Sequence, residues 1–439
     1  MFGFGRGSGS ELISRTLPSG LFVAPPWFKP RGYRHFDAPV GEGFLARASD
    51  SEFVAHRDWS PLIHYTKRTK RYKPAQGQTV YKNRPIMYAS HRDACILSKY
   101  AHDLSVALDA RYRQLDLNRN VIAYRQLGKA NYDFSAAAAR FALAISPCVV
   151  LSFDISGFFD HLDHGILKSR LRDILGVKEI PTDWYRVFRH VTAFSKIDRD
   201  DLAQHPVLGP NLRRASRDPI APIASVKAHG IQIATNPNKY GVPQGTPISS
   251  AFSNLYMIEL DKEVAAACTQ HGALYQRYSD DILIVCRHDS EVPLRSALLE
   301  ATSRHKLEMQ AEKCERMVFD ARNPASFQYL GFDVSPEGAL VRPSSLAKQW
   351  RKLRREIACA RRVGASSVAT GTSTKIYTKK LRRKFSPIGI RNFSRYARRA
   401  ASSFGSVHIR RQVLKLERAA DREIRALNEP IRPPHTKAP

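Results

Sequence analysis

Hydrophobic residues recur with a helical period in two segments and run continuously in a third. Residues 93–112 place apolar side chains three and four residues apart, which predicts an amphipathic helix with Asp93 as its N-terminal cap. Residues 131–145 predict a second helix of the same kind. The apolar run CVVLSFDI, residues 148–155, has the length of a buried strand and carries Asp154 near its end. By itself, an aspartate in that place is more often a helix cap than a catalyst.

A loop and a hairpin are predicted further along the chain. The segment GVPQGTPISSAFSNLYMIELDKEV, residues 241–264, begins with Gly and Pro and continues as a helix, for which Ser249 or Ser250 is the predicted cap. Its two glycines allow the backbone to approach a flat ligand closely, although an ordinary turn can have the same composition. In GALYQRYSDDILIVC, residues 272–286, two apolar strands flank SDD, which predicts a β-hairpin.

Asp280 and Asp281 are neighbours inside this apolar stretch, where their like charges repel and cost solvation. Successive side chains of a strand point to opposite faces, so both carboxylates can reach one point only at a turn. If the hairpin pairs with residues 148–155, Asp154 joins them. Three converging carboxylates would be neutralised by a hard cation such as Mg²⁺. The pattern therefore indicates a metal site, and two such ions about 4 Å apart can support phosphoryl transfer.

Composition adds a constraint on the partner. The chain has 439 residues, of which 43% are hydrophobic, a formal charge of +30 and a pI near 10.1. This charge favours a polyanion, with nucleic acid ahead of a membrane surface. No run of about 18 apolar residues is present and the start MFGFGRGSGS lacks the plan of a secretion signal, so we expect a cytoplasmic protein without a membrane segment. The six cysteines lie far apart and are expected to be reduced structural thiols.

The order of these motifs resembles that of the reverse transcriptases. FDISGFFDHLDH, GVPQGTPISSAFSN, YSDD, EKCERMVF and YLGF are similar to palm motifs A to E, and Tyr-x-Asp-Asp with Pro-Gln-Gly is typical of RNA-directed DNA polymerases. The resemblance implies an α/β (α+β) fold, a right-hand polymerase with fingers and an RRM-like palm sheet followed by a helical basic thumb. NRPIMYASHRDACILSKYAHDLS and VIAYRQLGKANYDFS resemble the fingers of the unknown and abortive-infection groups of bacterial reverse transcriptases, many of which act in antiphage defence.

The resemblance also implies roles for individual residues. Asp154 and Asp280 would be the main ligands of two Mg²⁺ ions, which Mn²⁺ could replace, with Asp281 close by and the carbonyl of Ile155 assisting. Phe159, five residues after Asp154, would be the aromatic gate that crowds a ribose 2′-hydroxyl.

Four further residues receive roles from the flanking motifs. Gln244 and Gly245 would line the incoming nucleotide and the template base, and FQYLGF (327–332) would support the primer end. Lys313 matches the motif D lysine that can protonate the pyrophosphate leaving group, and Arg84 matches a fingers arginine that holds the triphosphate. For Lys313 and Arg84, an ordinary solvated charge explains the residue equally well.

Composition and motifs together divide the chain into three regions. They are an N-terminal extension (1–75), a reverse transcriptase fingers and palm domain (76–335), and a basic helical thumb with a C-terminal extension (336–439). The interval from 165 to 240, between motifs A and B, is long enough to hold an insertion specific to a subgroup.

The last region is strongly basic. Residues 342–439 hold 26 Lys and Arg against 5 Asp and Glu. Residues 349–362, 379–404 and 409–427 predict helices with apolar stripes and basic faces. We expect a thumb that grips an RNA–DNA duplex or a structured RNA through its backbone.

Three functions are consistent with these features. The leading hypothesis is an RNA-directed DNA polymerase that extends a primer 3′-hydroxyl or a protein hydroxyl with dNTPs on an RNA template, giving a DNA product, in bacterial antiphage defence with a noncoding RNA as template. The second is a template-independent or protein-primed DNA-synthesising polymerase of the abortive-infection type. The third is a non-catalytic, maturase-like RNA-binding protein, against which the intact acids, the Pro-Gln-Gly loop and Phe159 argue. A homo-oligomer or a partner protein stays open for each.

Overall fold

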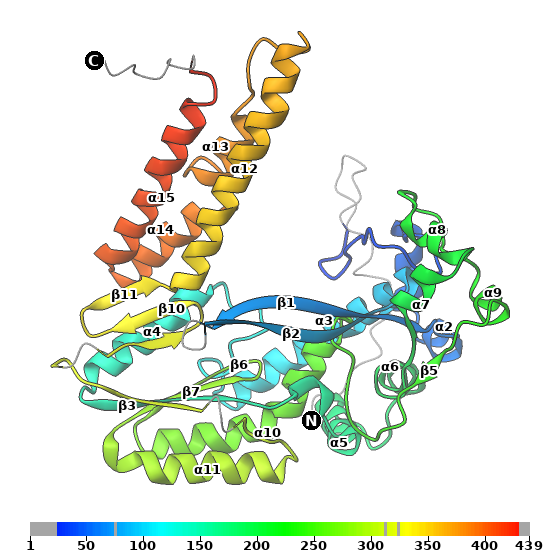
Figure 1. Cartoon of the computed structure of the whole chain (residues 1–439). Coiled ribbons are helices and arrows are strands. Elements are labelled where there is room, and N and C mark those ends of the chain that lie inside the picture. Colours follow the sequence, from blue (N-terminus) through cyan, green and yellow to red (C-terminus); the bar gives the residue numbers. More distant parts are fainter. Residues whose placement is uncertain (1–23, 74–76, 311–313, 323–324, 430–439) are drawn as a thin grey trace, which may run out of the picture.

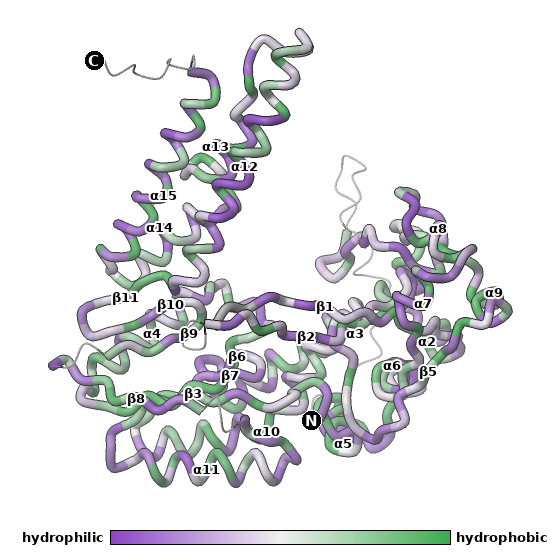
Figure 2. Tube along the Cα trace, in the orientation of Figure 1, coloured by the Kyte–Doolittle hydropathy of each residue, from purple (hydrophilic) through white to green (hydrophobic). Residues whose placement is uncertain are grey.

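The computed structural model describes residues 24–73, 77–310, 314–322 and 325–429. A helical arm rises from one end of a central sheet, and a long hairpin crosses above that sheet toward the base of the arm (Figure 1). Hydrophobic residues gather in the central sheet and its neighbouring helices, whereas the long hairpin and the arm carry many hydrophilic residues (Figure 2). In this part of the chain, no helix combines the length and the apolar character needed to cross a bilayer.

The central sheet has the strand order β6-β7-β3-β8, and each neighbouring pair is antiparallel. Apart from the interval between β3 and α10, its elements follow a β-α-β-β-α-β order with α10 and α11 on one face, which is the ferredoxin-like arrangement (Figure 1). The strand predicted at 148–155 and the predicted hairpin are both confirmed. The elements are β3 (Cys148–Asp154), α10 (Ser249–Gln270), β6 (Leu274–Tyr278), β7 (Asp281–Cys286), η4 (His288–Ser290), α11 (Glu291–Arg304) and β8 (Glu315–Phe319).

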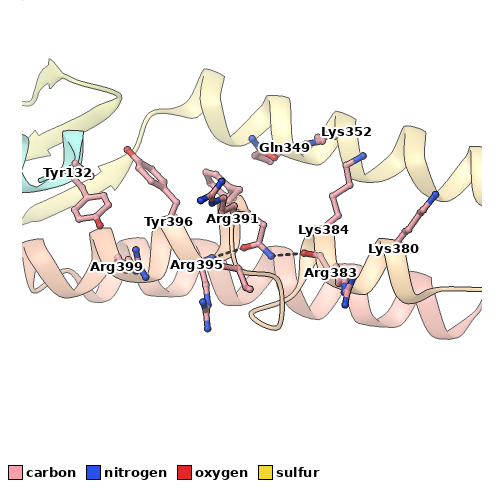
Figure 3. A pocket seen from close by; sticks show the side chains of 14 residues that line it. Tyr132, Gln349, Lys352, Lys380, Arg383, Lys384, Arg391, Arg395, Tyr396 and Arg399 are labelled. Atoms are coloured by element: carbon pink, nitrogen blue, oxygen red, sulfur yellow. Dashed lines mark hydrogen bonds between the residues drawn. The ribbon is translucent and has the colours of Figure 1, made fainter. Parts of the chain in front are cut away.

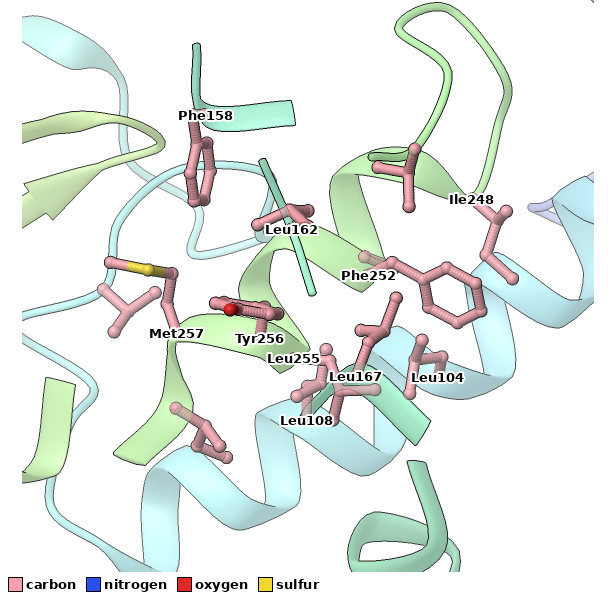
Figure 4. Packing of buried hydrophobic residues seen from close by; sticks show 14 of the residues in the cluster. Leu104, Leu108, Phe158, Leu162, Leu167, Ile248, Phe252, Leu255, Tyr256 and Met257 are labelled. Carbon is pink, nitrogen blue, oxygen red and sulfur yellow. The ribbon is translucent and has the colours of Figure 1, made fainter. Parts of the chain in front are cut away.

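The main hydrophobic core joins α10 to α3 (His91–Gln114), α5 (His164–Leu175) and the loop after β3. Figure 4 shows side chains of these four elements meeting, with Leu104 and Leu108 of α3 near Leu255 of α10. Of the 22 residues of α10, 14 are buried, so α10 is an internal helix that fixes the elements around it. All six cysteines are free thiols, and four of them are buried.

Both predicted helix caps are wrong. The cap of α3 is Ser90, whose Oγ accepts the N–H of Asp93 at 3.2 Å. The Asp93 carboxylate is buried and accepts a hydrogen bond from Nε of Arg57 at 3.0 Å instead. In α10, Ser249 is the first helical residue, and its Oγ donates to the carbonyl of Pro243 at 2.6 Å. Asp93 is occupied by a partner 36 residues away, which the local sequence does not show, and Ser249 is occupied by the loop that precedes its helix.

A second sheet, with the order β2-β1-β4-β5, carries the long hairpin. The domain boundary expected at residue 75 falls between β1 and β2, which pair from Ile63 to Lys73 of β1, so β1 belongs with the strand that follows it. The strands are β1 (Leu62–Lys73), β2 (Gln78–Tyr88), β4 (Ser195–Asp198) and β5 (Ala234–Thr235).

The interval between motifs A and B extends this second sheet. β4 joins β1 in parallel, and buried residues of the interval such as Ile197, Leu208 and Val226 form a small separate core with Ile63 of β1. The helices of this interval and of the N-terminal part are η1 (Glu42–Phe44), α1 (Leu45–Ser49), α2 (Ser51–His56), α6 (Thr182–Thr192), α7 (Arg199–Gln204), α8 (Leu208–Arg213) and α9 (Ile223–Ala228).

The C-terminal part begins with a three-stranded sheet and continues as the helical arm (Figure 1). The helix predicted over 379–404 is two helices, because Pro387 lacks a backbone N–H and disfavours the helical conformation of the residue before it. The remaining elements are α4 (Asn131–Ala144), β9 (Phe327–Tyr329), β10 (Phe332–Ser335), β11 (Gly338–Val341), α12 (Pro343–Ala369), α13 (Lys379–Phe385), α14 (Phe393–Phe404) and α15 (Val407–Arg425).

Candidate active site

The backbone positions of three predicted acidic residues lie at one edge of the central sheet. In the β3–β7 pair, Asp154 lies directly opposite Asp281, so both side chains leave the same face. Asp280 lies in the two-residue turn before β7, and the N–H of Ile155 donates to its carbonyl oxygen at 3.2 Å. Like charges at opposed positions destabilise a sheet, so a cation between these strand ends would be stabilising.

The chemistry of these donors fits a hard divalent cation. Asp154 and Asp280 are partly buried and Asp281 is exposed, so water and substrate can reach the oxygen atoms of these carboxylates. Over the described ranges, no three or more His, Cys, Asp or Glu side chains form a complete metal cluster. Mg²⁺ commonly takes one or two protein carboxylates and completes its shell with water and substrate phosphates. The carboxylates of Asp154 and Asp280 would therefore supply part of the coordination shell of a bound Mg²⁺.

Arg277, which the sequence motifs did not indicate, holds the turn that carries Asp280. Its side chain is fully buried, and Nε and Nη2 each donate to one carboxylate oxygen of Asp261 at 2.7 Å. Nη1 donates to the carbonyl of Ser279 at 3.0 Å, and both Nη atoms contact Oδ1 of Asn254 at 3.3 Å. Burial alone would lower the pKa of Arg277, but the charge of Asp261 raises it above its ordinary value.

Two sequence signals could have revealed this network. Arg277 is a charged residue inside an apolar strand. Asn254 and Asp261 are seven residues apart, about two helical turns, and therefore share a face of α10. The turn also needs this support because Ser279 has φ +63°, a conformation that is unfavourable for a residue with a Cβ.

Phe159 lies in η3 (Phe158–Asp160), the short helix after β3. Phe158 is buried, whereas Phe159 is only partly buried, and their ring centroids are 5.4 Å apart. The N–H of Val242 donates to the carbonyl of Phe159 at 2.8 Å, and the N–H of Gly241 donates to that of Leu162 at 2.9 Å. The motif B loop is thereby fastened to the loop that presents Phe159.

The motif B loop also touches the long hairpin. The N–H of Met87 donates to the carbonyl of Gln244 at 2.8 Å. Gly245 has φ +115°, and a Cβ on it would lie 2.6 Å from the carbonyl oxygen of Met87. Arg84 is exposed on the same strand and shares a face with Ile86, which borders Gly245. The structure therefore brings Arg84, Gln244 and Gly245 to one part of the second sheet.

The predicted primer support is the β9–β10 hairpin. Its two-residue turn has positive φ at Leu330 (+47°) and Gly331 (+93°), as tight hairpins require. Phe327, Tyr329 and Phe332 share a buried hydrophobic cluster with Leu283 and Val285, so the hairpin packs against β7 of the central sheet. Burial raises the pKa of Tyr329 well above its ordinary value. Lys313 lies outside the described residues.

A basic groove of about 870 Å³ lies on the arm between α12, α13 and α14 (Figure 3). Seven cationic side chains and no Asp or Glu line it: Lys352, Lys380, Arg383, Lys384, Arg391, Arg395 and Arg399. Tyr132 and Tyr396 lie at the end nearest the three-stranded sheet, with ring centroids 5.2 Å apart. The groove has the charge and the shape to hold a phosphate backbone.

A family model described as reverse transcriptase (RNA-dependent DNA polymerase) matches residues 82–334. This range includes both acidic strand ends, the motif B loop and the β9–β10 turn. The match covers more than half of the sequence, and the chain therefore belongs to the reverse transcriptase family of RNA-dependent DNA polymerases. The predicted α/β (α+β) fold, with an RRM-like palm sheet followed by a C-terminal helical region, is confirmed. A comparison with curated proteins found no match.

Solved structures that the chain matches include telomerases from two Candida species. The Candida albicans telomerase, in complex with a TWJ fragment of telomeric RNA, is 13% identical over 88% of this chain and 58% of that chain, with a TM-score of 0.47. The apo telomerase of Candida tropicalis is 12% identical over 84% and 60%, with a TM-score of 0.44. The RNA-dependent RNA polymerase of a human picobirnavirus is 12% identical over 64% and 46%, with a TM-score of 0.36. The alignments span less than two thirds of each of these proteins.

Proposed function

We propose that this chain copies an RNA template into DNA by two-metal nucleotidyl transfer. The observation that carries the proposal is the register of β3 and β7, which places Asp154 opposite Asp281 beside the turn that holds Asp280. The motif B loop bonds to the loop that follows Asp154, and the β9–β10 hairpin packs against β7. A protein that only bound RNA would not require three acidic residues beside the motif B loop and the β9–β10 hairpin.

In this proposal, Asp154 and Asp280 hold two Mg²⁺ ions, assisted by Asp281 and the Ile155 carbonyl. When bound, the ions would activate the attacking hydroxyl and stabilise the leaving oxygen. Phe159 excludes the 2′-hydroxyl of a ribonucleotide.

Four other residues bind the substrates or move a proton. Gln244 and Gly245 contact the nascent base pair, and Arg84 holds the triphosphate of the incoming dNTP. Lys313 donates a proton to pyrophosphate.

The proposed biological role rests on the resemblance of the fingers sequence to antiphage reverse transcriptases. We assign the chain to bacterial defence, in the cytoplasm, with a noncoding RNA as template. Sequencing of the RNA and DNA that co-purify with the protein would identify template and product. Phage challenge of cells that carry the wild type or an inactive variant tests the defence role, and equal plaque counts would contradict it.

The decisive variant for the active site is Asp280→Asn with Asp281→Asn. Incorporation of labelled dNTP on a primed RNA should fall to the level of a no-enzyme blank, while the fold stays intact, because carboxylates without their ions mainly repel. Asp200→Asn with Asp201→Asn is the matched control, since it removes an exposed acidic pair from α7. Incorporation by the first variant above the blank would refute the site.

The same assay separates templated from untemplated synthesis. Once co-purified RNA has been removed by nuclease, synthesis should require added RNA and should report its sequence. Equal synthesis without template would instead support the template-independent alternative.

A further inference from the structure

Tyr124 combines a strained backbone with an exposed ring beside the acidic turn. Its φ is +61°, a left-handed conformation that is unfavourable for a bulky residue, and the residue is 48% exposed. The Tyr124 hydroxyl is hydrogen bonded to Oγ of Ser279 at 3.1 Å. Ser279 is buried, has φ +63° and directly precedes Asp280. Two residues with unfavourable backbone conformations are therefore joined by their side chains at the turn that carries Asp280.

Tertiary contacts impose this conformation on Tyr124. The N–H of Ile122 donates to the carbonyl of Arg277 at 3.1 Å, so the segment before Tyr124 runs along β6. The side-chain amide of Asn254, on α10, donates to the carbonyl of Ala123 at 3.0 Å. Arg277 and Asn254 also belong to the network that holds the turn of Asp280. One set of contacts therefore fixes both the tyrosine and the acidic turn.

A packing role does not account for a tyrosine at this position. The residue is about half exposed, so its ring contributes little to the hydrophobic core. Glycine would adopt the same backbone conformation without strain. Strained residues that their surroundings hold in place occur mainly at functional sites, where the strain fixes the position of a side chain. The observed conformation of Tyr124 therefore points to a ligand for its ring.

The surroundings of Tyr124 identify this ligand. Together with Pro247 and Ser250 of motif B, Tyr124 lines a cavity of about 250 Å³. Tyr124 therefore lies between the acidic turn and the start of α10. In the proposed function, the primer 3′-hydroxyl has to reach ions at Asp154 and Asp280, and the template base lies at motif B. The last base pair of primer and template spans these two places, and an aromatic ring can contact it whatever its sequence.

We propose that Tyr124 is a positioning residue for the primer end: its ring contacts the last base pair of the RNA–DNA hybrid, and its hydroxyl holds the Ser279 turn. A mismatched pair has a different shape and does not lie on the ring in the same place, so Tyr124 favours extension of matched ends. This inference rests on the proposed function, because that function brings a primer end to the acidic turn.

The first test is single-turnover extension of a DNA primer on an RNA template, with a matched or a mismatched primer end. Tyr124→Ala should lower the maximal rate on the matched end about tenfold, because the 3′-hydroxyl is positioned less well. The KM for dNTP should stay close to that of the wild type. Extension of the mismatched end should fall much less, so the preference for matched ends declines. A purely structural role would lower both rates by the same factor.

Tyr124→Phe separates the ring from the hydroxyl. It should retain the preference for matched ends and lose part of the rate, because only the contact with Ser279 is removed. Ser279→Ala removes the other partner of this contact and should lower the rate by the same factor. The two changes together should lower it no further, since they remove one shared interaction.

A second test needs no synthesis. The full chain is mixed, without dNTP, with a hybrid whose primer ends in 2-aminopurine. The fluorescence of this base should change when the wild type binds, and most of the change should be absent when Tyr124→Ala is bound to the same extent. Tyr185→Ala is the matched control in both tests, since it removes a tyrosine that is 38% exposed from α6, and it should behave as the wild type. If Tyr124→Ala unfolds, Tyr124→Gly removes the same ring and relieves the backbone strain.

An unchanged preference for matched ends in the variant without the ring would overturn the proposal. The same conclusion would follow if the 2-aminopurine signal did not change with the wild type, or changed equally with both proteins. A signal that depends on Tyr124 in a protein that synthesises no DNA would keep this inference and reject the proposed function.

Discussion

Phe158 and Phe159 are adjacent in sequence but lie in different environments. Phe158 is buried in the main core, whereas Phe159 is partly exposed on the loop that follows Asp154. The hydrogen bond from Val242 to the Phe159 carbonyl fixes this loop against the motif B loop. Of the two rings, only that of Phe159 is partly exposed, which supports its proposed contact with a bound sugar, whereas Phe158 serves packing.

Phe159→Ala should open space at the sugar of the bound nucleotide. Ribonucleotide incorporation should rise relative to deoxyribonucleotide incorporation, while overall efficiency falls because the substrate is positioned less well. Steady-state incorporation of matched ribo- and deoxyribonucleotides by both proteins gives the ratio. Phe158→Ala is the control, which should cost about 3–5 kcal/mol of stability and leave the ratio unchanged. An unaltered ratio in Phe159→Ala would show that this residue is not a gate.

Arg277→Met should destabilise the fold by about 3–5 kcal/mol, because it leaves the buried carboxylate of Asp261 without its partner. Adding Asp261→Leu removes that carboxylate and should recover most of the stability. Activity should stay low in the double variant, because the carbonyl of Ser279 still lacks its donor. Urea unfolding and nucleotide incorporation, measured on both variants, separate the two effects. Recovery of stability and activity together would mean that Arg277 serves the fold alone.

At the scale of elements, the spacing of apolar residues predicted those helices and strands whose formation depends on the local sequence. The helices at α3 and α4, the strand β3 and the β6–β7 hairpin all form where apolar spacing and turn residues indicated them. Side chains with distant partners were not predictable in this way: Asp93 bonds to Arg57, 36 residues away. The Arg277 network depends on the packing of β6 against α10, which no local pattern specifies. Likewise, the acidic pair indicated a metal site, but the register that opposes Asp154 to Asp281 required the structure.

Gly245→Ala should be more harmful than an ordinary glycine substitution at a turn. Gly245 combines φ +115° with a Cβ position 2.6 Å from the Met87 carbonyl oxygen, so the motif B loop would have to move off β2. Gly230→Ala is the matched control, with φ +72° and nothing within 4 Å of its Cβ position. The control should cost about 1–2 kcal/mol from backbone strain alone.

Urea unfolding should show a larger loss for Gly245→Ala, and the KM for dNTP should rise only in that variant. Equal losses of stability and an unchanged KM would mean that the contact with β2 does not position the loop.

Across the whole molecule, the acidic edge of the central sheet and the basic arm are expected to contribute differently to nucleic-acid binding. The carboxylates repel a phosphate backbone unless cations are bound, so most of the affinity for nucleic acid should come from the arm. The sequence predicts a helix with a basic face over residues 349–362, which includes Arg354, Arg355, Arg361 and Arg362. None of these four lines the groove, and Arg354 and Arg361 instead line a smaller cavity beside Glu423 of α15.

Neutralising four groove cations with Lys380→Gln, Arg383→Gln, Arg391→Gln and Arg395→Gln should therefore weaken nucleic-acid binding and flatten its salt dependence. The slope of log K against log salt should fall by about 0.9 for each phosphate that the variant no longer neutralises. Replacing Arg354, Arg355, Arg361 and Arg362 with Gln removes the same charge from outside the groove and should change the slope much less. Anisotropy titrations of one RNA–DNA hybrid with both variants, over a range of salt concentrations, make the comparison. If the two slopes fall equally, the arm attracts nucleic acid through its net charge and the groove is not the binding surface.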